Sequence, residues 1–566
     1  MLSYLNPLPS LPSQYRGPYK VGSSEFEIPI SEIKSISPVP DERITTIKFR
    51  LFYPTTPEAT SKQSIYWLPS PQAQWNEAYA SFMGASERYV SVMKSMLNLW
   101  NYAKLPVVKD APLLTPASGS RRPICIFSHG LGGNFNTYSS IVGNLASSGV
   151  VCVVPEHRDG SAPISFIKNA KGEVETSVSY QKHSHAPSPQ VLNARNAQLR
   201  VRMWELELTY AVIQAMNEGR QFTNYAEVSS QSQLGLEKQL NLLPGQVAWA
   251  GHSFGAATVT QFVKSVYYHK HLPESMNLAT SEGDSKIIGG DERWDERPLY
   301  TTDAESELVK QITPRSPVAL LDCWTMPLRG ETTKWLWERP LPTYDRQTQS
   351  SPDAKPSTVA VMSAEFYKWP DLLNRTRALL SKSPVEAAEA FDQQKKRREN
   401  ETPKTRSDET NASNSIPELS KQDEDPAIAA SLQDSAEPSR QHSPIPSAGQ
   451  SSPESAQSSN TSFAPSEHES RRVDSTSPLE PHLYHVPQSA HLSQSDFGIL
   501  FPNLTKYVMK AIEPEKTLEL NVRAILAVMK GAGLSVTSWV EGEDYILDIG
   551  KLEKKERWVR VPLVDA

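Results

Sequence analysis

The chain has 566 residues, a formal net charge of −6 and three cysteines. So small a charge gives no reason to expect a nucleic-acid partner, and three cysteines are too few for a disulfide framework. No segment approaches the run of about 18 apolar residues that a membrane-spanning helix needs. The first 20 residues also lack the charged and apolar regions of a signal peptide. We therefore expect a cytoplasmic protein without a transmembrane span, at most peripheral at membranes.

Short apolar segments alternate with helical patterns along the chain. Predicted strands occupy residues 44–53, 123–128, 150–155, 246–250, 317–321 and 358–363. Predicted helices occupy residues 137–147, 191–218, 255–268, 498–512 and 518–532. Strands that alternate with helices in this way predict an α/β fold, in which a mostly parallel sheet is flanked by helices on both faces.

One long segment, residues 383–481, has a different composition. It is rich in Ser, Pro, Glu, Gln and Asn and contains few apolar residues. Such a segment cannot bury enough apolar surface to offset the entropy of ordering, so we predict a disordered insertion. The insertion divides the folded domain into a first part, residues 1–382, and a second part, residues 482–566.

Residues 251–255 read Gly-His-Ser-Phe-Gly and lie between a predicted strand and a predicted helix. Small residues at both ends of this G-x-S-x-G motif permit a sharp turn that exposes Ser253 at the carboxyl edge of the sheet. The amides at the helix N-terminus favour negative charge at that point. Ser253 is therefore the candidate nucleophile; the alternative is a glycine-bounded turn in which the serine only caps a helix.

A second glycine-rich turn, His129-Gly130-Leu131-Gly132-Gly133, follows the predicted strand 123–128. A serine nucleophile requires hydrogen-bond donors that stabilise the oxyanion. This turn holds the place of the HGGG-type loop of esterases, so the amides of Leu131 and Phe254 are the predicted donors. We expect His129 to order the loop rather than to act as a base; the alternative for the whole motif is a simple tight turn.

The orienting acid and the base should follow the serine in the order acid, then histidine. Asp322 and Glu365 each lie at the end of a predicted strand, and either could orient an imidazole. Outside the predicted insertion, three later histidines are candidates for the base: His482, His485 and His491. His491 lies in a polar loop before a helical pattern, where a catalytic loop is expected, whereas a packing role is expected for one of the other two.

Seven motifs together resemble the platelet-activating factor acetylhydrolases of the plasma and type II intracellular class. They are FSHGLGGNFNTYS, PEHRDGSA, RNAQLRVR, GHSFGAATV, LLDCWTMPL, FYKWPDLL and AHLSQSDF, in this order along the chain. The resemblance implies an α/β-hydrolase fold and a calcium-independent serine esterase that hydrolyses the sn-2 acyl group of phospholipids, with short or oxidised chains preferred. It matches LLDCWTMPL to the family's acid strand and AHLSQSDF to its histidine loop, which favours Asp322 over Glu365 and selects His491.

Two insertions, near residues 272–312 and 383–481, lengthen the gaps from Ser253 to Asp322 and from Asp322 to His491 relative to the family. Because the entropy of closing a loop grows slowly with its length, a surface insertion need not disturb the site. No cofactor or metal is predicted. His183 and His185 form only a weak candidate metal pair, since the sequence offers no convincing further ligands.

Residues 89–103, YVSVMKSMLNLWNYA, place apolar side chains at helical spacing. This stripe could lie in a phospholipid surface, with Trp100 at the level of the headgroups, or it could face the protein core. Two other functions remain open beside the phospholipid esterase. One is a general carboxylester or triacylglycerol lipase, and the other is a hydrolase-fold scaffold that acts through its disordered insertion.

Overall fold

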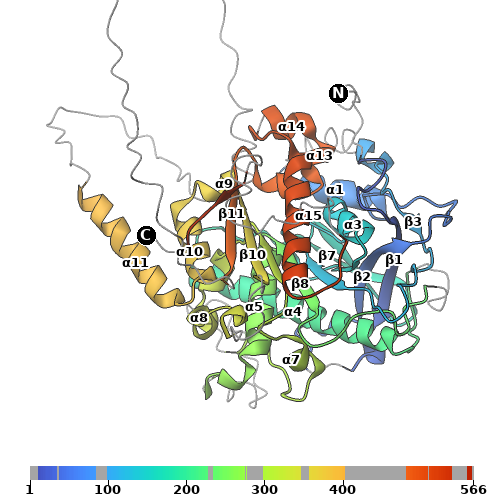
Figure 1. Cartoon of the computed structure of the whole chain (residues 1–566), viewed down its shortest axis with the longest axis horizontal. Coiled ribbons are helices and arrows are strands. Elements are labelled where there is room, and N and C mark those ends of the chain that lie inside the picture. Colours follow the sequence, from blue (N-terminus) through green and yellow to red (C-terminus); the bar gives the residue numbers. More distant parts are fainter. Residues whose placement is uncertain are drawn as a thin grey trace, which may run out of the picture.

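The computed structural model describes residues 11–34, 37–84, 98–226, 234–274, 276, 297–345, 356–401, 480–507, 509–537 and 558–563. Its main sheet has ten strands in the order β12-β11-β10-β9-β8-β4-β5-β2-β1-β3 (Figure 1). The strands are β1 (Lys20–Pro29), β2 (Thr46–Thr55), β3 (Val108–Lys109), β4 (Ile124–Ser128), β5 (Val151–Pro155), β8 (Val247–His252), β9 (Val318–Leu321), β10 (Thr358–Ser363), β11 (His482–Val486) and β12 (Val559–Arg560). A separate hairpin joins β6 (Ile164–Lys168) and β7 (Val174–Ser179).

The strand order and directions are those of an α/β-hydrolase fold. From β5 through β4, β8, β9 and β10 to β11, each neighbouring pair is parallel. β2 pairs antiparallel with both β5 and β1. The six predicted strands and the mostly parallel sheet are confirmed, although β8 continues two residues further than expected, through Gly251 and His252.

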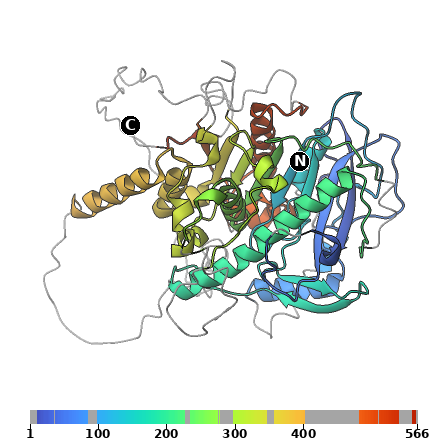
Figure 2. The same cartoon turned by 90° about the horizontal axis from the view of Figure 1, so that it is seen from below.

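Helices cover both faces of the sheet. One face carries α3 (Ser139–Ser147) and α15 (Pro514–Gly531), and the other carries α4 (Pro189–Asn217) and α5 (Phe254–Tyr267) (Figures 1 and 2). Successive β4 side chains alternate between two hydrophobic clusters: Ile124 and Ile126 pack on the α4 side, and Cys125 and Phe127 on the α3 side. A strand buried on both faces explains why the β4 segment reads as continuously apolar.

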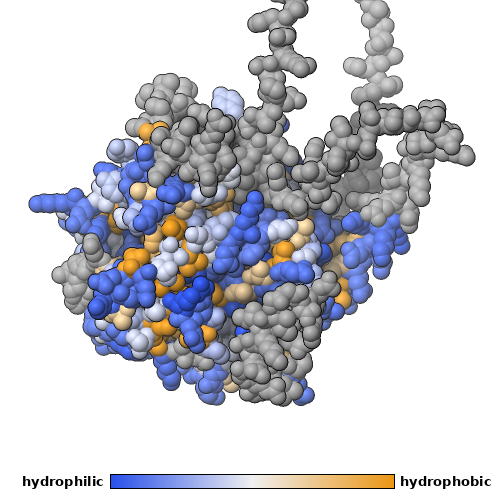
Figure 3. Space-filling model, turned by 180° about the vertical axis from the view of Figure 1, so that it is seen from behind, coloured by the Kyte–Doolittle hydropathy of each residue, from blue (hydrophilic) through white to orange (hydrophobic). Residues whose placement is uncertain are grey.

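Further helices and 3-10 turns complete the described structure. They are α1 (Gln72–Phe82), α7 (Glu307–Gln311), α8 (Glu331–Trp337), α9 (Ala364–Tyr367), α10 (Pro370–Leu380), α11 (Pro384–Glu401), α13 (Phe497–Leu500) and α14 (Pro502–Tyr507), with the 3-10 turns η2 (Ile30–Glu32), η3 (Asn98–Tyr102), η5 (His269–His271), η6 (Met326–Arg329), η7 (Pro342–Asp345) and η9 (His491–Gln494). The outer surface mixes scattered hydrophobic residues with hydrophilic ones, as Figure 3 shows for the face opposite to that of Figure 1. In the described part of the chain, no helix is long and apolar enough to cross a membrane.

Three sequence-based expectations need correction. The predicted helix 498–512 is broken into α13 and α14, since Pro502 cannot continue the preceding helix. The predicted disorder is wrong at its start, because residues 384–401 form α11, where buried Phe391 packs against Ala378 of α10. Residues 402–479 lie outside the described residues.

The expected helix of residues 89–103 is also wrong in its described part. Residues 89–97 lie outside the described residues, and 98–102 form η3 rather than an α-helix. Trp100 is only 4% exposed and packs edge-on against Trp67. The indole of Trp100 is therefore a core group rather than a headgroup anchor, although Tyr102 beside it is 70% exposed.

One buried lysine on α5 predicts a pH dependence of stability. Lys264 is 1% exposed, and within the described residues its Nζ has no hydrogen-bond partner. Burial, with a smaller contribution from Arg339, lowers the pKa of Lys264 to about 7. In the unfolded chain a lysine holds its proton to about pH 10.4. The folded state therefore binds fewer protons between pH 7 and 10, and its stability rises with pH across that window.

The substitution Lys264→Met should remove the free-energy cost of burying the lysine amine. A buried polar group without a partner costs about 1–3 kcal/mol, so we expect the variant to raise the free energy of unfolding at pH 7 by about 2 kcal/mol. The gain should shrink toward pH 10, where the unfolded lysine is also losing its charge. Urea unfolding at pH 7 and pH 9.5 measures both values. Lys310→Met, at an exposed lysine of α7, is the control with no expected gain, and a gain that grows with pH would contradict the argument.

Candidate active site

The candidate site lies where the chain changes direction across the sheet. β4 and β8 are parallel neighbours, but the chain leaves β4 toward β5 on one side and leaves β8 toward β9 on the other. Such a switch point at the carboxyl ends of parallel strands is where open α/β sheets bind ligands. The loop 129–133, here called the oxyanion loop, follows β4, and Ser253 follows β8. The fold therefore places the two glycine-rich motifs side by side.

Ser253 occupies a strained turn between β8 and α5. Its φ of 55° and ψ of −118° belong to a conformation that non-glycine residues rarely adopt. Its amide donates to the carbonyl of Leu321 at 2.9 Å, and its carbonyl accepts from the amide of Trp324 at 3.2 Å. A Cβ on Gly255 would collide with the backbone of Ser128. Only glycine therefore permits this close approach of the Ser253 turn to β4, as the sequence pattern predicts.

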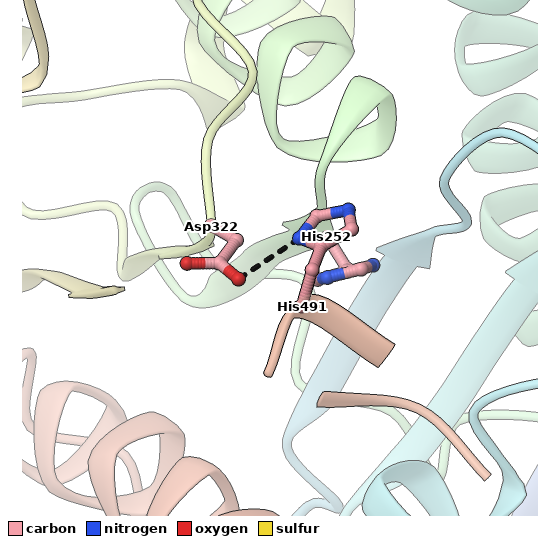
Figure 4. A group of neighbouring side chains, drawn as sticks. All are labelled: His252, Asp322 and His491. Atoms are coloured by element: carbon pink, nitrogen blue, oxygen red, sulfur yellow. Dashed lines mark hydrogen bonds and ion pairs between the residues drawn. The ribbon is translucent and has the colours of Figure 1, made fainter. Parts of the chain in front are cut away.

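Asp322 and His491 meet through a hydrogen bond, although they are 169 positions apart. His491 Nδ1 lies 2.9 Å from Asp322 Oδ2, as Figure 4 shows. The other carboxylate oxygen of Asp322 accepts from the amide of Ser363 at 2.6 Å. Asp322 is fully buried and directly follows β9, whereas His491 is 7% exposed at the start of η9. An acid with both oxygens bound holds an imidazole in one tautomer and orientation.

Two rings and a second carboxylate hold His491 from other sides. The Phe366 ring stacks on the imidazole of His491 with centroids 4.1 Å apart and an interplanar angle of 4°. The His252 ring lies 4.4 Å from the same imidazole. Glu365, the alternative acid in the sequence, accepts a hydrogen bond from the backbone amide of His491 at 2.8 Å. Glu365 thus binds the backbone of this residue, while Asp322 binds its side chain.

His252 connects this group to the oxyanion loop. Its Nδ1 lies 2.8 Å from the hydroxyl of Tyr138, which accepts from the amide of Gly130 at 3.1 Å. Burial holds the pKa of His252 well below its usual range, and the neighbouring His491 lowers it further. A Cβ on Gly130 would lie 3.1 Å from the Cβ of Ser253. The oxyanion loop therefore packs directly against the turn that carries Ser253.

The predicted oxyanion donors lie in the two turns that this packing brings together. Leu131 is in the middle of the oxyanion loop, and Phe254 is the first residue of α5. Within the residues that the structure describes, neither amide donates a hydrogen bond in a turn, loop or cap. Their neighbours do: the amide of Gly132 donates to the carbonyl of Ser161 at 2.9 Å. Two amides left open in turns that adjoin Ser253 are compatible with a developing oxyanion.

A second hydrogen-bonded group of serine, histidine and acid side chains lies next to the oxyanion loop. His157 Nε2 is 2.9 Å from Ser128 Oγ, and His157 Nδ1 is 2.8 Å from Glu205 Oε2. The Ser128 and His157 side chains have no exposed surface, and Ser128 lies within β4 rather than at a strained turn. Burial holds the pKa of His157 well below its usual range and raises that of Glu205 to about 7. This group lacks solvent access, so its order of contacts alone does not make it a catalytic site.

Other candidate residues lie elsewhere. His482 and His485 both belong to β11, and the His485 ring stacks on Tyr367 with centroids 3.9 Å apart. His183 and His185 do not join a set of three metal-ligating residues among those described. Among the described residues, the group of three that could hold a metal ion is His252, Asp322 and His491, whose ligand atoms lie within 4.8 Å of one another.

One residue of the histidine loop, residues 490–497, was missed by the sequence reasoning. The carboxylate of Asp496 accepts from the amides of Ser139 and Ser140, both at 2.9 Å, at the start of α3. It also accepts from Trp67 Nε1 at 3.1 Å. Burial raises the pKa of Asp496 to about 6 in spite of these donors. Asp496 thereby ties the loop of His491 to the helix that follows the oxyanion loop. Its place within the quoted motif AHLSQSDF was the available signal.

Known proteins are similar to part of this chain. A putative phospholipase A2 from Schizosaccharomyces pombe is 31% identical over 257 residues, which cover 43% of this chain and 57% of the relative. A platelet-activating factor acetylhydrolase from Cavia porcellus is 28% identical over 248 residues, covering 43% of this chain and 50% of the relative. The chain thus spans about half the length of the curated relatives it matches.

Among solved structures, a ferulic acid esterase from Streptomyces cinnamoneus aligns with 97% of this chain and all of its own at 10% identity and a TM-score of 0.43. The order and directions of the strands identify the fold. The family comparison is more specific, and it covers the oxyanion loop and Ser253 but ends before Asp322. Residues 9–278 match the family described as platelet-activating factor acetylhydrolase, isoform II, and the resemblance inferred from the motifs is confirmed over this part of the chain.

Proposed function

We propose that this protein is a calcium-independent serine esterase that hydrolyses the sn-2 acetyl, short or oxidised acyl ester of phospholipids. The observation that carries the proposal is the Asp322–His491 hydrogen bond beside the strained turn of Ser253. A serine hydroxyl becomes a useful nucleophile when a positioned base removes its proton. The described group supplies an imidazole whose tautomer is fixed by a buried acid.

In the proposed mechanism, Ser253 Oγ attacks the ester carbonyl and His491 accepts its proton. Asp322 stabilises the imidazolium that forms, and the amides of Leu131 and Phe254 bind the oxyanion. His491 then protonates the departing lysophospholipid oxygen. Water, deprotonated by the same imidazole, attacks the acyl-enzyme and releases the free acid and Ser253.

Two features support a phospholipid substrate rather than a small soluble ester. The similar proteins are named as a putative phospholipase A2 and as a platelet-activating factor acetylhydrolase. On the surface, exposed Leu99 and Tyr102 of η3 and Tyr507 of α14 offer apolar side chains. Trp100 of η3 packs against Phe501, which lies between α13 and α14, with ring centroids 4.8 Å apart, so these elements are neighbours. Exposed apolar and aromatic side chains beside the histidine loop suit contact with a lipid surface.

Release of acetate from an sn-2 acetyl phosphatidylcholine tests the proposal, with EDTA present and with a short-chain triacylglycerol as the competing substrate. We expect turnover of the phospholipid to be unaffected by EDTA and to exceed turnover of the triacylglycerol. A preference for triacylglycerol would instead support the general lipase. Deletion of residues 402–479 distinguishes the esterase from a scaffold that acts through this segment, because an esterase should retain turnover without these residues.

A further inference from the structure

Two of the quoted motifs, PEHRDGSA and RNAQLRVR, meet behind the oxyanion loop, and the proposed reaction does not use either of them directly. Arg202 of α4 is fully buried and donates in three directions. Its Nη1 lies 2.7 Å from the carbonyl of His129 and 3.4 Å from Ser128 Oγ. Its Nη2 lies 2.5 Å from Ser161 Oγ, and its Nε lies 2.7 Å from Asp159 Oδ2. One guanidinium thus binds the oxyanion loop and both polar residues of the DGSA turn.

The same turn holds the loop from its other end. The second oxygen of Asp159 accepts from the amide of Ser161 at 3.1 Å and from its hydroxyl at 2.5 Å. The carbonyl of Ser161 in turn accepts from the amide of Gly132 at 2.9 Å. The carbonyl of His129 and the amide of Gly132 are therefore both fixed. Between them lies the peptide of Gly130 and Leu131, whose Gly130 carbonyl accepts from the amide of Gly133 at 3.2 Å. The two anchors hold this peptide, and with it the Leu131 amide, from either side.

Arg202 also touches the residue that carries the other predicted donor. Its guanidinium carbon lies 4.5 Å from the centre of the Phe254 ring. A cation over an aromatic face is attracted to it, most strongly where water is excluded. Phe254 is the first residue of α5, so a fixed ring limits movement of the backbone turn that carries its amide.

The residue type matters for these contacts. A guanidinium presents donors in a planar fork, whereas a lysine is a single point charge on a flexible stem. Lys at position 202 could retain the ion pair with Asp159 but could not also bind the His129 carbonyl and stack on Phe254. Oxyanion donors stabilise the transition state more than the bound substrate, so misplaced donors reduce kcat with little effect on KM.

We infer that Arg202 is a positioning residue of the oxyanion hole, held by Asp159 and Ser161, and that it sets the relative placement of the Leu131 and Phe254 amides. This inference rests on the proposed esterase function.

The test compares Arg202→Lys with Arg158→Lys. Arg158 is also a buried, ion-paired arginine, but it binds Glu205 and Thr46 instead of the oxyanion loop. We expect Arg202→Lys to lower kcat about 100-fold, the effect of losing one oxyanion donor, with KM within about 3-fold of wild type. The pH dependence of kcat should keep its wild-type shape, because His491 and Asp322 are untouched. Arg158→Lys should lose stability in urea but retain kcat within about 3-fold.

Ser161→Ala provides a second, milder variant if Arg202→Lys does not fold. It removes the hydroxyl that Arg202 and Asp159 bind but keeps the carbonyl that Gly132 needs, and we expect kcat to fall about 10-fold at unchanged KM. Wild-type kcat in a folded Arg202→Lys or Ser161→Ala variant, or an equal loss in Arg158→Lys, overturns the inference. Failure of the proposed function is separate: a wild-type protein whose Ser253 does not react with a fluorophosphonate would show it.

Discussion

Ser253→Ala should abolish esterase turnover, with a fall in kcat of about 10⁵-fold or more, the range seen when a triad nucleophile is removed. The physical reason is that Ser253 Oγ is the group that forms the acyl-enzyme in the proposed mechanism. The residual rate would come from the oxyanion donors and from binding of the substrate. Acetate release from the sn-2 acetyl phospholipid measures the loss, and mass spectrometry after fluorophosphonate treatment locates the modified serine.

Ser128→Ala is the matched control, because Ser128 belongs to the second hydrogen-bonded group of serine, histidine and acid. We expect Ser128→Ala to lose stability, since it empties a buried hydroxyl position, and still to be labelled on Ser253. Labelling that survives in Ser253→Ala and disappears in Ser128→Ala would reverse the assignment of the nucleophile.

Asp322→Asn should have the next largest effect, a fall in kcat of about 10⁴-fold. An amide NH₂ in place of Asp322 Oδ2 would donate to His491 Nδ1 and so favour the tautomer that carries its proton on Nε2. That tautomer cannot accept the proton of Ser253, and the imidazolium would lose its counter-charge. Steady-state kinetics on the phospholipid measure the loss, and thermal unfolding shows whether the fold is retained.

Glu365→Gln is the matched control for Asp322→Asn. Both carboxylates bind His491, but Glu365 accepts from the backbone amide, and a glutamine oxygen can still accept that bond. We expect kcat to fall about 10-fold or less, since a hydrogen bond to a neutral acceptor is weaker by about 1 kcal/mol. A larger loss in Glu365→Gln than in Asp322→Asn would identify Glu365 as the acid.

Local patterns in the chain predicted the elements that carry the site. The strand before Ser253, the helix after it and the glycines at 251 and 255 are all read within a dozen residues, because a strand, a turn and a helix are defined by neighbouring residues. The same holds for β4 and the oxyanion loop. The break at Pro502 and the helix of residues 384–401 were missed, the second because its polar composition hides the packing of Phe391 against α10.

The choice between Asp322 and Glu365 shows what the sequence alone could not decide. Both lie at the ends of neighbouring parallel strands, and the residue pattern allows either of them to reach an imidazole. Only the family resemblance favoured Asp322. In the structure the two carboxylates bind different atoms of His491. Their exact positions decide this difference, since both are carboxylates. The same is true of Arg202, whose contacts with His129, Ser161 and Phe254 join segments separated by more than 40 positions. The sequence by itself determined the strands and the turns, because these depend on local backbone preferences, and it supplied the candidate catalytic groups, because these are given by residue type. Tertiary structure decided which buried polar groups meet, because each needs a partner and the fold chooses which one is within reach.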